Sequence, residues 1–129
     1  MTIPLLCALG AFALNYLTKL PVAVAMAKEG KGYDNKSPRE QQARLTGWGK
    51  RALAAHQNSF EVAPLFAAGV LIGHVTQGNP GLSSLLAVTF IVSRFVYTGL
   101  YLANLSSFRS AVWGIGILCS FGIGLSSYL

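Results

Sequence analysis

Polar residues at helical spacing interrupt an otherwise apolar stretch of this chain. Arg51 and Asn58 are seven residues apart, and Asn58 and Glu61 are three apart, so a helix would place them on one stripe within about 80°. His56 lies two residues before Asn58 and is expected to point away from that stripe, as an interfacial histidine. A carboxylate this far inside an apolar segment is energetically costly. It therefore marks either a functional site or a pairing site.

A second polar stripe lies in a later apolar stretch, where Arg94, Tyr97 and Tyr101 share one helical face at separations of three and four residues. Depths can be compared by counting about 1.5 Å per residue from the polar end of each stretch. This count places Glu61 and Arg94 both about 15 Å deep, with Asn58 near the level of Tyr97. Equal depths predict that the two helices face each other.

The two stripes leave two interpretations open. Glu61 and Arg94 could neutralise each other and merely fix the register of their helices. More polar groups lie toward one end of the two helices than neutralisation requires: Arg51, Asn58, Tyr97, Tyr101 and Arg109. Their number favours a polar pocket that opens to the cytoplasm.

The composition indicates a membrane protein. Only 11% of the 129 residues are charged and 53% are hydrophobic, whereas soluble domains have about 25% charged residues. Four long runs nearly free of charge each approach the roughly 20 residues that span a bilayer. The sequence therefore predicts a single all-α domain, an integral membrane bundle of four transmembrane helices. The predicted spans are about 3–27, 50–76, 82–103 and 109–128, with a polar loop over 28–49.

Local features refine these spans. The first run lacks a basic start and is longer than the apolar core of a signal peptide, about 7–15 residues, so we expect a retained helix. Pro21 is expected to bend that helix. Within the polar loop we expect a short helix over 38–46, which the glycines of residues 47–49 should end. The last span contains a row of small residues that lets helices approach closely, namely Gly116, Ser120 and Gly124.

The distribution of charge predicts the topology. Residues 28–51 hold seven cations and three acids, whereas the turn over 77–81 has no charge. By the positive-inside rule the 28–49 loop is cytoplasmic and both termini lie outside. Since the net charge of +6 comes mainly from this loop, we expect no nucleic-acid partner.

The two cysteines are not expected to do chemistry. Cys7 and Cys119 both lie inside apolar runs, where a free cysteine acts as a small apolar side chain. Their spacing indicates neither a metal site nor a disulfide framework.

The two stripes resemble those of the MAPEG family, the membrane-associated proteins in eicosanoid and glutathione metabolism. Two motifs carry the resemblance: Arg51-x6-Asn58-x2-Glu61-x2-Pro64-x-Phe66, and Arg94-x2-Tyr97-x3-Tyr101 with a basic residue soon after. The segment Ala55-His56-x-Asn58 looks most like the microsomal glutathione transferases. Other segments look like the short prokaryotic members, among them Tyr33-Asp34-Asn35 and Pro38-Arg39. The resemblance covers essentially the whole chain.

The resemblance implies a homotrimer in a bacterial inner membrane, with glutathione as co-substrate bound between subunits near the cytosolic face. By position it implies glutathione ligands at Arg51, Asn58, Glu61, Arg94, Tyr97 and Tyr101. Arg109 matches the catalytic arginine that activates the thiolate. A guanidinium near the sulfur lowers the thiol pKa because it favours the thiolate.

The resemblance implies a glutathione-dependent transferase or peroxidase acting on lipophilic electrophiles or hydroperoxides that partition into the membrane lipids. A non-catalytic protein of the same family, which binds a lipid or fatty acid, is the alternative. A small transporter is a third possibility, but no inverted repeat is evident. Two of the positions that bind anionic groups in the family differ here. Ala54 stands where the eukaryotic enzymes have an arginine, and Val62 where leukotriene synthase has a tyrosine.

Overall fold

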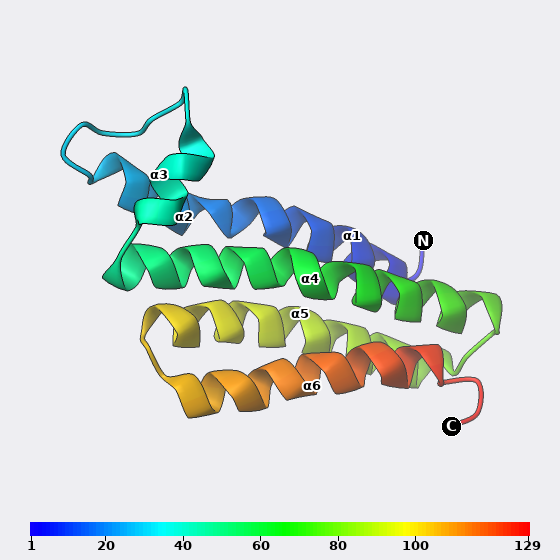
Figure 1. Cartoon of the computed structure of the whole chain (residues 1–129). Helices are drawn as coiled ribbons and strands as arrows, with labels where there is room; N and C mark the ends of the chain where they lie inside the picture. Colours follow the sequence, from blue (N-terminus) through cyan, green and yellow to red (C-terminus); the bar gives the residue numbers. More distant parts are fainter.

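The computed structural model describes residues 1–129 and contains helices but no strand (Figure 1). The helices are α1 (Ile3–Leu17), α2 (Lys19–Ala27), α3 (Pro38–Arg44), α4 (Gly47–Val75), α5 (Pro80–Leu102) and α6 (Ser106–Gly124). Four helical units are long and apolar enough to cross a membrane: Ile3–Ala27, Gly47–Val75, Pro80–Leu102 and Ser106–Gly124. The predicted all-α bundle with four membrane-length helices is confirmed.

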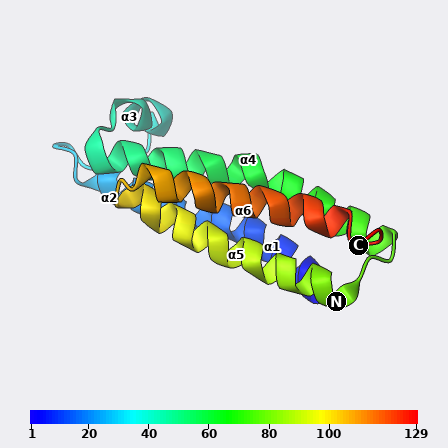
Figure 2. The ribbon, with the colours of Figure 1, turned by 90° about the horizontal axis from the view of Figure 1, so that it is seen from below.

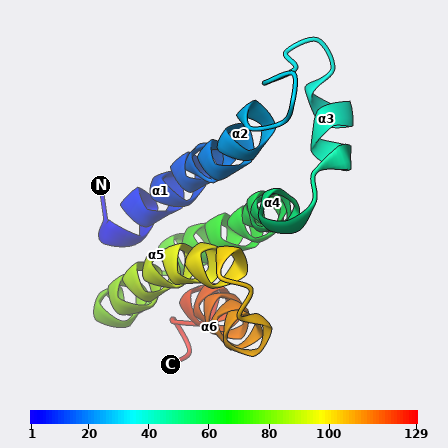
Figure 3. The same cartoon turned by 90° about the vertical axis from the view of Figure 1, so that its left-hand side faces the viewer.

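The long units run side by side: α4 packs against the α1–α2 unit and against both α5 and α6, and α1 also packs against α5 (Figures 1 and 3). Both chain termini lie at the end of the bundle opposite α3 (Figure 1). We call the end that carries the 28–49 loop the basic end, and the end that carries the termini the opposite end. This arrangement follows from four antiparallel passes, the first two joined by the loop that contains α3 and the others by short turns.

The first long unit is divided in two at Thr18. Pro21 has no N–H to donate to the carbonyl of Leu17, and its ring crowds that carbonyl. The predicted bend is therefore a break one turn before the proline. The Thr18 hydroxyl donates to the Asn15 carbonyl at 3.1 Å, which keeps the two pieces nearly continuous.

The start of α4 differs from the prediction. The glycines of residues 47–49 do not separate two helices but form the first turn of α4, and α3 already ends at Arg44. Thr46 is extended, with φ −126° and ψ 167°, and it makes the break instead. Gly49 is required for packing, because a Cβ there would lie 2.9 Å from the Cβ of Ala25 on α2.

The polar loop is held in place by one buried side chain. Gln41 on α3 donates from Nε2 to the carbonyls of Met26 and Gly32, at 3.1 and 2.9 Å. Its Oε1 accepts the backbone N–H of Asp34 at 2.8 Å. These bonds fix α3 against the end of α2.

The turns after α4 and α5 have the same construction. Gln77 and Asn104 adopt left-handed conformations, with φ of 54° and 61°. The next residue in each turn then donates its N–H back into the helix, Gly78 to Gly73 at 2.8 Å and Leu105 to Leu100 at 3.0 Å. This is the Schellman arrangement, and it reverses the chain within a few residues.

The helices pack in two ways. Between α4 and α5, the rings of Phe66 and Phe90 stack with centroids 3.8 Å apart. Between α4 and α6, small residues bring the backbones together: a Cβ on Gly73 would lie 2.6 Å from the carbonyl oxygen of Ile123. A Cβ on Gly124 would lie 3.6 Å from the Cα of Gly69. The predicted close approach through the small residues of the last span is confirmed at Ser120 and Gly124, whereas Gly116 lies against Ser93 and Phe90 of α5.

The outward surface of the bundle is apolar. Many large hydrophobic side chains of the long helices are exposed in the single chain, among them Leu9, Leu20, Leu71, Leu85, Phe95 and Leu118. Exposed apolar area of this extent suits a surface that contacts lipid or another subunit. The protein is therefore an integral membrane protein.

Candidate functional site

The polar stripes of α4 and α5 meet in the half of the bundle nearer the basic end. The Nη2 of Arg94 donates to the Oδ1 of Asn58 at 2.7 Å. The Nδ2 of Asn58 donates in turn to the Oε2 of Glu61 at 3.0 Å. A neutral amide thus joins the guanidinium to the carboxylate, and the prediction that α4 and α5 face each other is confirmed.

The structure does not contain the direct pair of Glu61 with Arg94 that one of the two interpretations assumed. The two charged groups form no ion pair; Asn58 lies between them and bonds both. The physical reason is that the long Arg94 side chain extends to the turn of α4 that bears Asn58, one turn before Glu61. Arg94 is 5% exposed, while Glu61 is exposed. The carboxylate therefore stays available to another positively charged group.

The row continues along α5 through aromatic rings. The guanidinium carbon of Arg94 lies 4.2 Å from the centroid of the Tyr97 ring. Tyr97 and Tyr101 are in edge contact, with centroids 5.6 Å apart. Arg109, in the first turn of α6, lies with its guanidinium carbon 4.1 Å from the Tyr101 centroid. Cations over ring faces are held by the ring quadrupole, so each arginine has a defined position.

We call this set the polar row. It is a continuous chain of contacts across three helices: Glu61, Asn58, Arg94, Tyr97, Tyr101 and Arg109. Five of the six predicted ligand positions and the predicted catalytic arginine therefore come together in the structure.

Arg51, the sixth predicted ligand, lies apart from the polar row. Its Nε and Nη2 both lie 3.4 Å from the carbonyl oxygen of Leu102. This carbonyl is at the C-terminal end of α5, where a helix attracts positive charge. Arg51 therefore ties the start of α4 to the end of α5 at the basic end.

His56 points away from the polar row, as its spacing predicts. Its Nδ1 lies 2.9 Å from the Oγ1 of Thr18, at the break in the first unit. The neighbouring cavity, about 420 Å³, is also lined by Lys19 and Arg39. The role of Thr18 was not predicted, because a single threonine in an apolar run carries no periodic signal.

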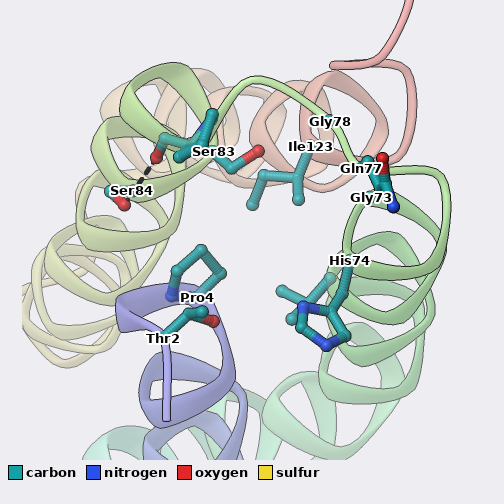
Figure 4. A pocket seen from close by; sticks show the side chains of 11 residues that line it. Thr2, Pro4, Gly73, His74, Gln77, Gly78, Ser83, Ser84 and Ile123 are labelled. Carbon is teal, nitrogen blue, oxygen red and sulfur yellow. Dashed lines mark hydrogen bonds between the residues drawn. The ribbon is translucent and has the colours of Figure 1, made fainter.

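A second cavity of about 240 Å³ lies at the opposite end of the bundle (Figure 4). Its polar lining includes Thr2, His74, Gln77, Ser83 and Ser84. No lysine or arginine lines it. It therefore lacks the cations with which the polar row could bind an anionic ligand.

No group of three or more histidine, cysteine or acidic side chains is placed to hold a metal ion. The chemistry of the site is thus that of guanidinium, phenol, amide and carboxylate groups. These groups can bind anions and ammonium groups and can stabilise a negative charge on a reacting atom.

A comparison with protein families identifies a family for this chain. The chain matches the MAPEG family over residues 3–129. A comparison with curated proteins gave no match. The family match covers all four membrane-length helices and every residue of the polar row. The chain belongs to the MAPEG family.

Proposed function

We propose that this protein is a membrane-bound, glutathione-dependent transferase or peroxidase. The MAPEG family includes glutathione transferases and related enzymes, and its members generally use glutathione. Its substrates would be lipophilic electrophiles or hydroperoxides dissolved in the bilayer. The observation that carries the proposal is the polar row, which joins a carboxylate and two arginines across three helices.

The chemistry of glutathione suits this row. The tripeptide has two carboxylates, one ammonium group and one thiol. Arg94 in the row and Arg51 outside it would supply guanidinium groups for the carboxylates, and a guanidinium binds a carboxylate through two parallel hydrogen bonds. Glu61 is exposed and supplies the acid for the ammonium group. Asn58 and the two tyrosines of the row supply further hydrogen bonds.

The thiol would lie near Arg109. This side chain is half-buried, stacked on Tyr101 and placed in the first turn of α6. A guanidinium and a helix N-terminus both favour a thiolate over a thiol. An unperturbed thiol with a pKa near 8.5 is only a few per cent ionised at pH 7, so lowering this pKa by about two units gains more than tenfold in thiolate.

The site is completed by a second subunit in this proposal. Glu61 and the outer side of the row are open in a single chain. On another face, the cavity beside His56 holds Lys19 and Arg39, and no ion pair joins either of these to an acid. In a cyclic homotrimer, two different faces of neighbouring subunits meet. We expect this cavity of one subunit to cover the polar row of the next.

The proposed location is the bacterial inner membrane, with the basic end in the cytoplasm. Seven cations in residues 28–51 against no charge in the 77–81 turn support this orientation. Single cysteines at Asn35 and Thr76, in a background without Cys7 and Cys119, test it in intact cells. An impermeant thiol reagent should label position 76 only; labelling of position 35 alone would reverse the orientation.

Arg109→Ala tests the catalytic part of the proposal, with Arg109→Lys as the control that keeps a positive charge. Wild-type protein with glutathione should show the ultraviolet absorbance of a bound thiolate near neutral pH. The alanine variant should lose this absorbance and its conjugation activity, while glutathione binding measured by calorimetry weakens less. Wild-type protein that binds glutathione without thiolate absorbance would contradict catalysis. The non-catalytic lipid-binding function would then take its place.

A further inference from the structure

Two buried polar atoms have no hydrogen-bond partner in the chain, and they are of opposite kinds. One is the Nε of Arg94, a donor, and the other is the Oδ1 of Asn15, an acceptor. Both side chains are more than nine-tenths buried, with exposed fractions of 5% and 3%. Such groups are rarely left unpaired in folded proteins.

Both side chains line the same small cavity, between α1, α4 and α5. The cavity has room of about 10 Å³, close to the least that holds one water molecule. The remaining lining is mostly apolar, but Ser59 is a third polar member. Its hydroxyl donates to the Ala55 carbonyl at 3.2 Å, so the lone pairs of its oxygen can accept another hydrogen bond.

We propose that Asn15 is a positioning residue for Arg94 and that one buried water joins them. The water accepts the Nε hydrogen of Arg94 and donates its two hydrogens to the Oδ1 of Asn15 and the Oγ of Ser59. These three bonds equal the usual number for a buried water. The same bonds determine the orientation of the Asn15 amide, since only its oxygen can serve as the acceptor.

The consequence for the site is that Arg94 is held on two sides. Nη2 bonds Asn58 on α4, and Nε bonds the water that Asn15 holds from α1. The guanidinium plane over Tyr97 is then fixed by the first membrane unit as well as by α4. The effect of Asn15 on glutathione rests on the proposed function, whereas its pairing with Arg94 does not.

The pairing can be tested by nuclear magnetic resonance of the arginine Nε–H groups in detergent-solubilised protein. Of the five arginines, Arg94 alone is buried, so its signal should exchange slowly with solvent; Arg94→Lys would assign it. We expect a cross-peak from this hydrogen to a long-lived water. Asn15→Leu, which keeps the volume but removes the acceptor, should shift the signal and speed its exchange at least tenfold. Asn15→Asp keeps an acceptor oxygen and should restore slow exchange.

A double-mutant cycle gives a second measurement that needs no glutathione. Asn15→Leu should lower the thermal midpoint of wild-type protein but have no further effect when Arg94 is replaced by methionine. The pairing would be overturned if the two substitutions had additive effects. It would also be overturned if the Arg94 signal showed no water cross-peak and did not change in Asn15→Leu.

The effect of Asn15 on the site is tested separately, by measuring the affinity for glutathione. If the protein binds glutathione, Asn15→Leu should raise the Kd severalfold, while Asn15→Asp stays near wild type. A pairing confirmed by resonance in a protein that fails to bind glutathione would contradict the proposed function alone. An unchanged Kd for Asn15→Leu, in a protein that does bind, would overturn the positioning role.

Discussion

The two ends of this bundle use α4 in opposite ways. Toward the basic end, α4 presents Asn58 to the long Arg94 side chain of α5, and Glu61 bonds Asn58 at the exposed end of the polar row. Toward the opposite end, Gly69 and Gly73 remove side chains altogether, and the backbones of α4 and α6 come into contact. Figure 2 shows α6 running alongside α4 over this half of the bundle.

The difference teaches how a small membrane protein can hold charged groups in place. Apolar burial contributes little to association between helices in lipid, so close packing and hydrogen bonds must fix their positions. The glycine contacts fix α4 against α6 in one half. The other half is then free to carry long polar side chains whose contacts, not backbone proximity, determine their geometry.

The largest expected effect comes from filling the close contact between α4 and α6. Gly69→Ala would place a Cβ on the backbone of Ser120, and overpacking of this kind costs about 1–3 kcal/mol, occasionally more. The yield and the thermal midpoint of detergent-purified protein should both fall clearly. Gly114→Ala is the matched control on α6, because a Cβ there would meet nothing within 4 Å. Equal effects of the two variants would contradict the role of close packing.

The next expected effect lies in the polar row, where Asn58 and Glu61 can be compared directly. Asn58→Leu leaves the buried Arg94 without its partner on α4, which should lower the free energy of unfolding by about 1–3 kcal/mol. Glu61→Gln keeps an acceptor oxygen for Asn58 at an exposed position, so its effect should stay within about 0.5 kcal/mol. Thermal unfolding in detergent would measure both. A larger loss of unfolding free energy in Glu61→Gln than in Asn58→Leu would instead indicate a direct pair of Glu61 with Arg94.

Much of the site follows from the sequence because depth along a helix is proportional to residue number. Counting residues from the polar end of each helix was enough to match α4 with α5 and to predict that Asn58, Arg94 and Tyr97 lie close together. It missed the intervening position of Asn58, because an arginine side chain is longer than the 5.4 Å rise of one helical turn. It also missed the contribution of Asn15, since contacts from a third helix depend on rotation and crossing angle, which spacing in one helix does not give.

The fold was predictable for a similar reason, and the errors of the prediction are at helix ends. Apolar runs of membrane length gave the four long units, and Pro21 gave the position of the break in the first. The start of α4 was misplaced because glycines usually end helices. Gly49 serves instead to let α2 approach α4, a tertiary contact that local sequence does not reveal.

The smallest expected effect concerns the opposite end and would show whether the two ends are separate in function. His74 is exposed and lines the cavity there, with no lysine or arginine beside it to bind a carboxylate. If the protein binds glutathione as proposed, His74→Ala should therefore leave the Kd within about twofold of wild type, a difference below roughly 0.4 kcal/mol. Ser84→Ala, in the same cavity, removes only a hydroxyl that bonds the Pro80 carbonyl at 2.7 Å and should behave likewise. Calorimetry on both variants, alongside Arg94→Lys as the positive control at the basic end, measures the contrast. A tenfold loss of affinity in His74→Ala with an unchanged thermal midpoint would mean that glutathione also contacts the opposite end. The polar row would then be only part of the binding site.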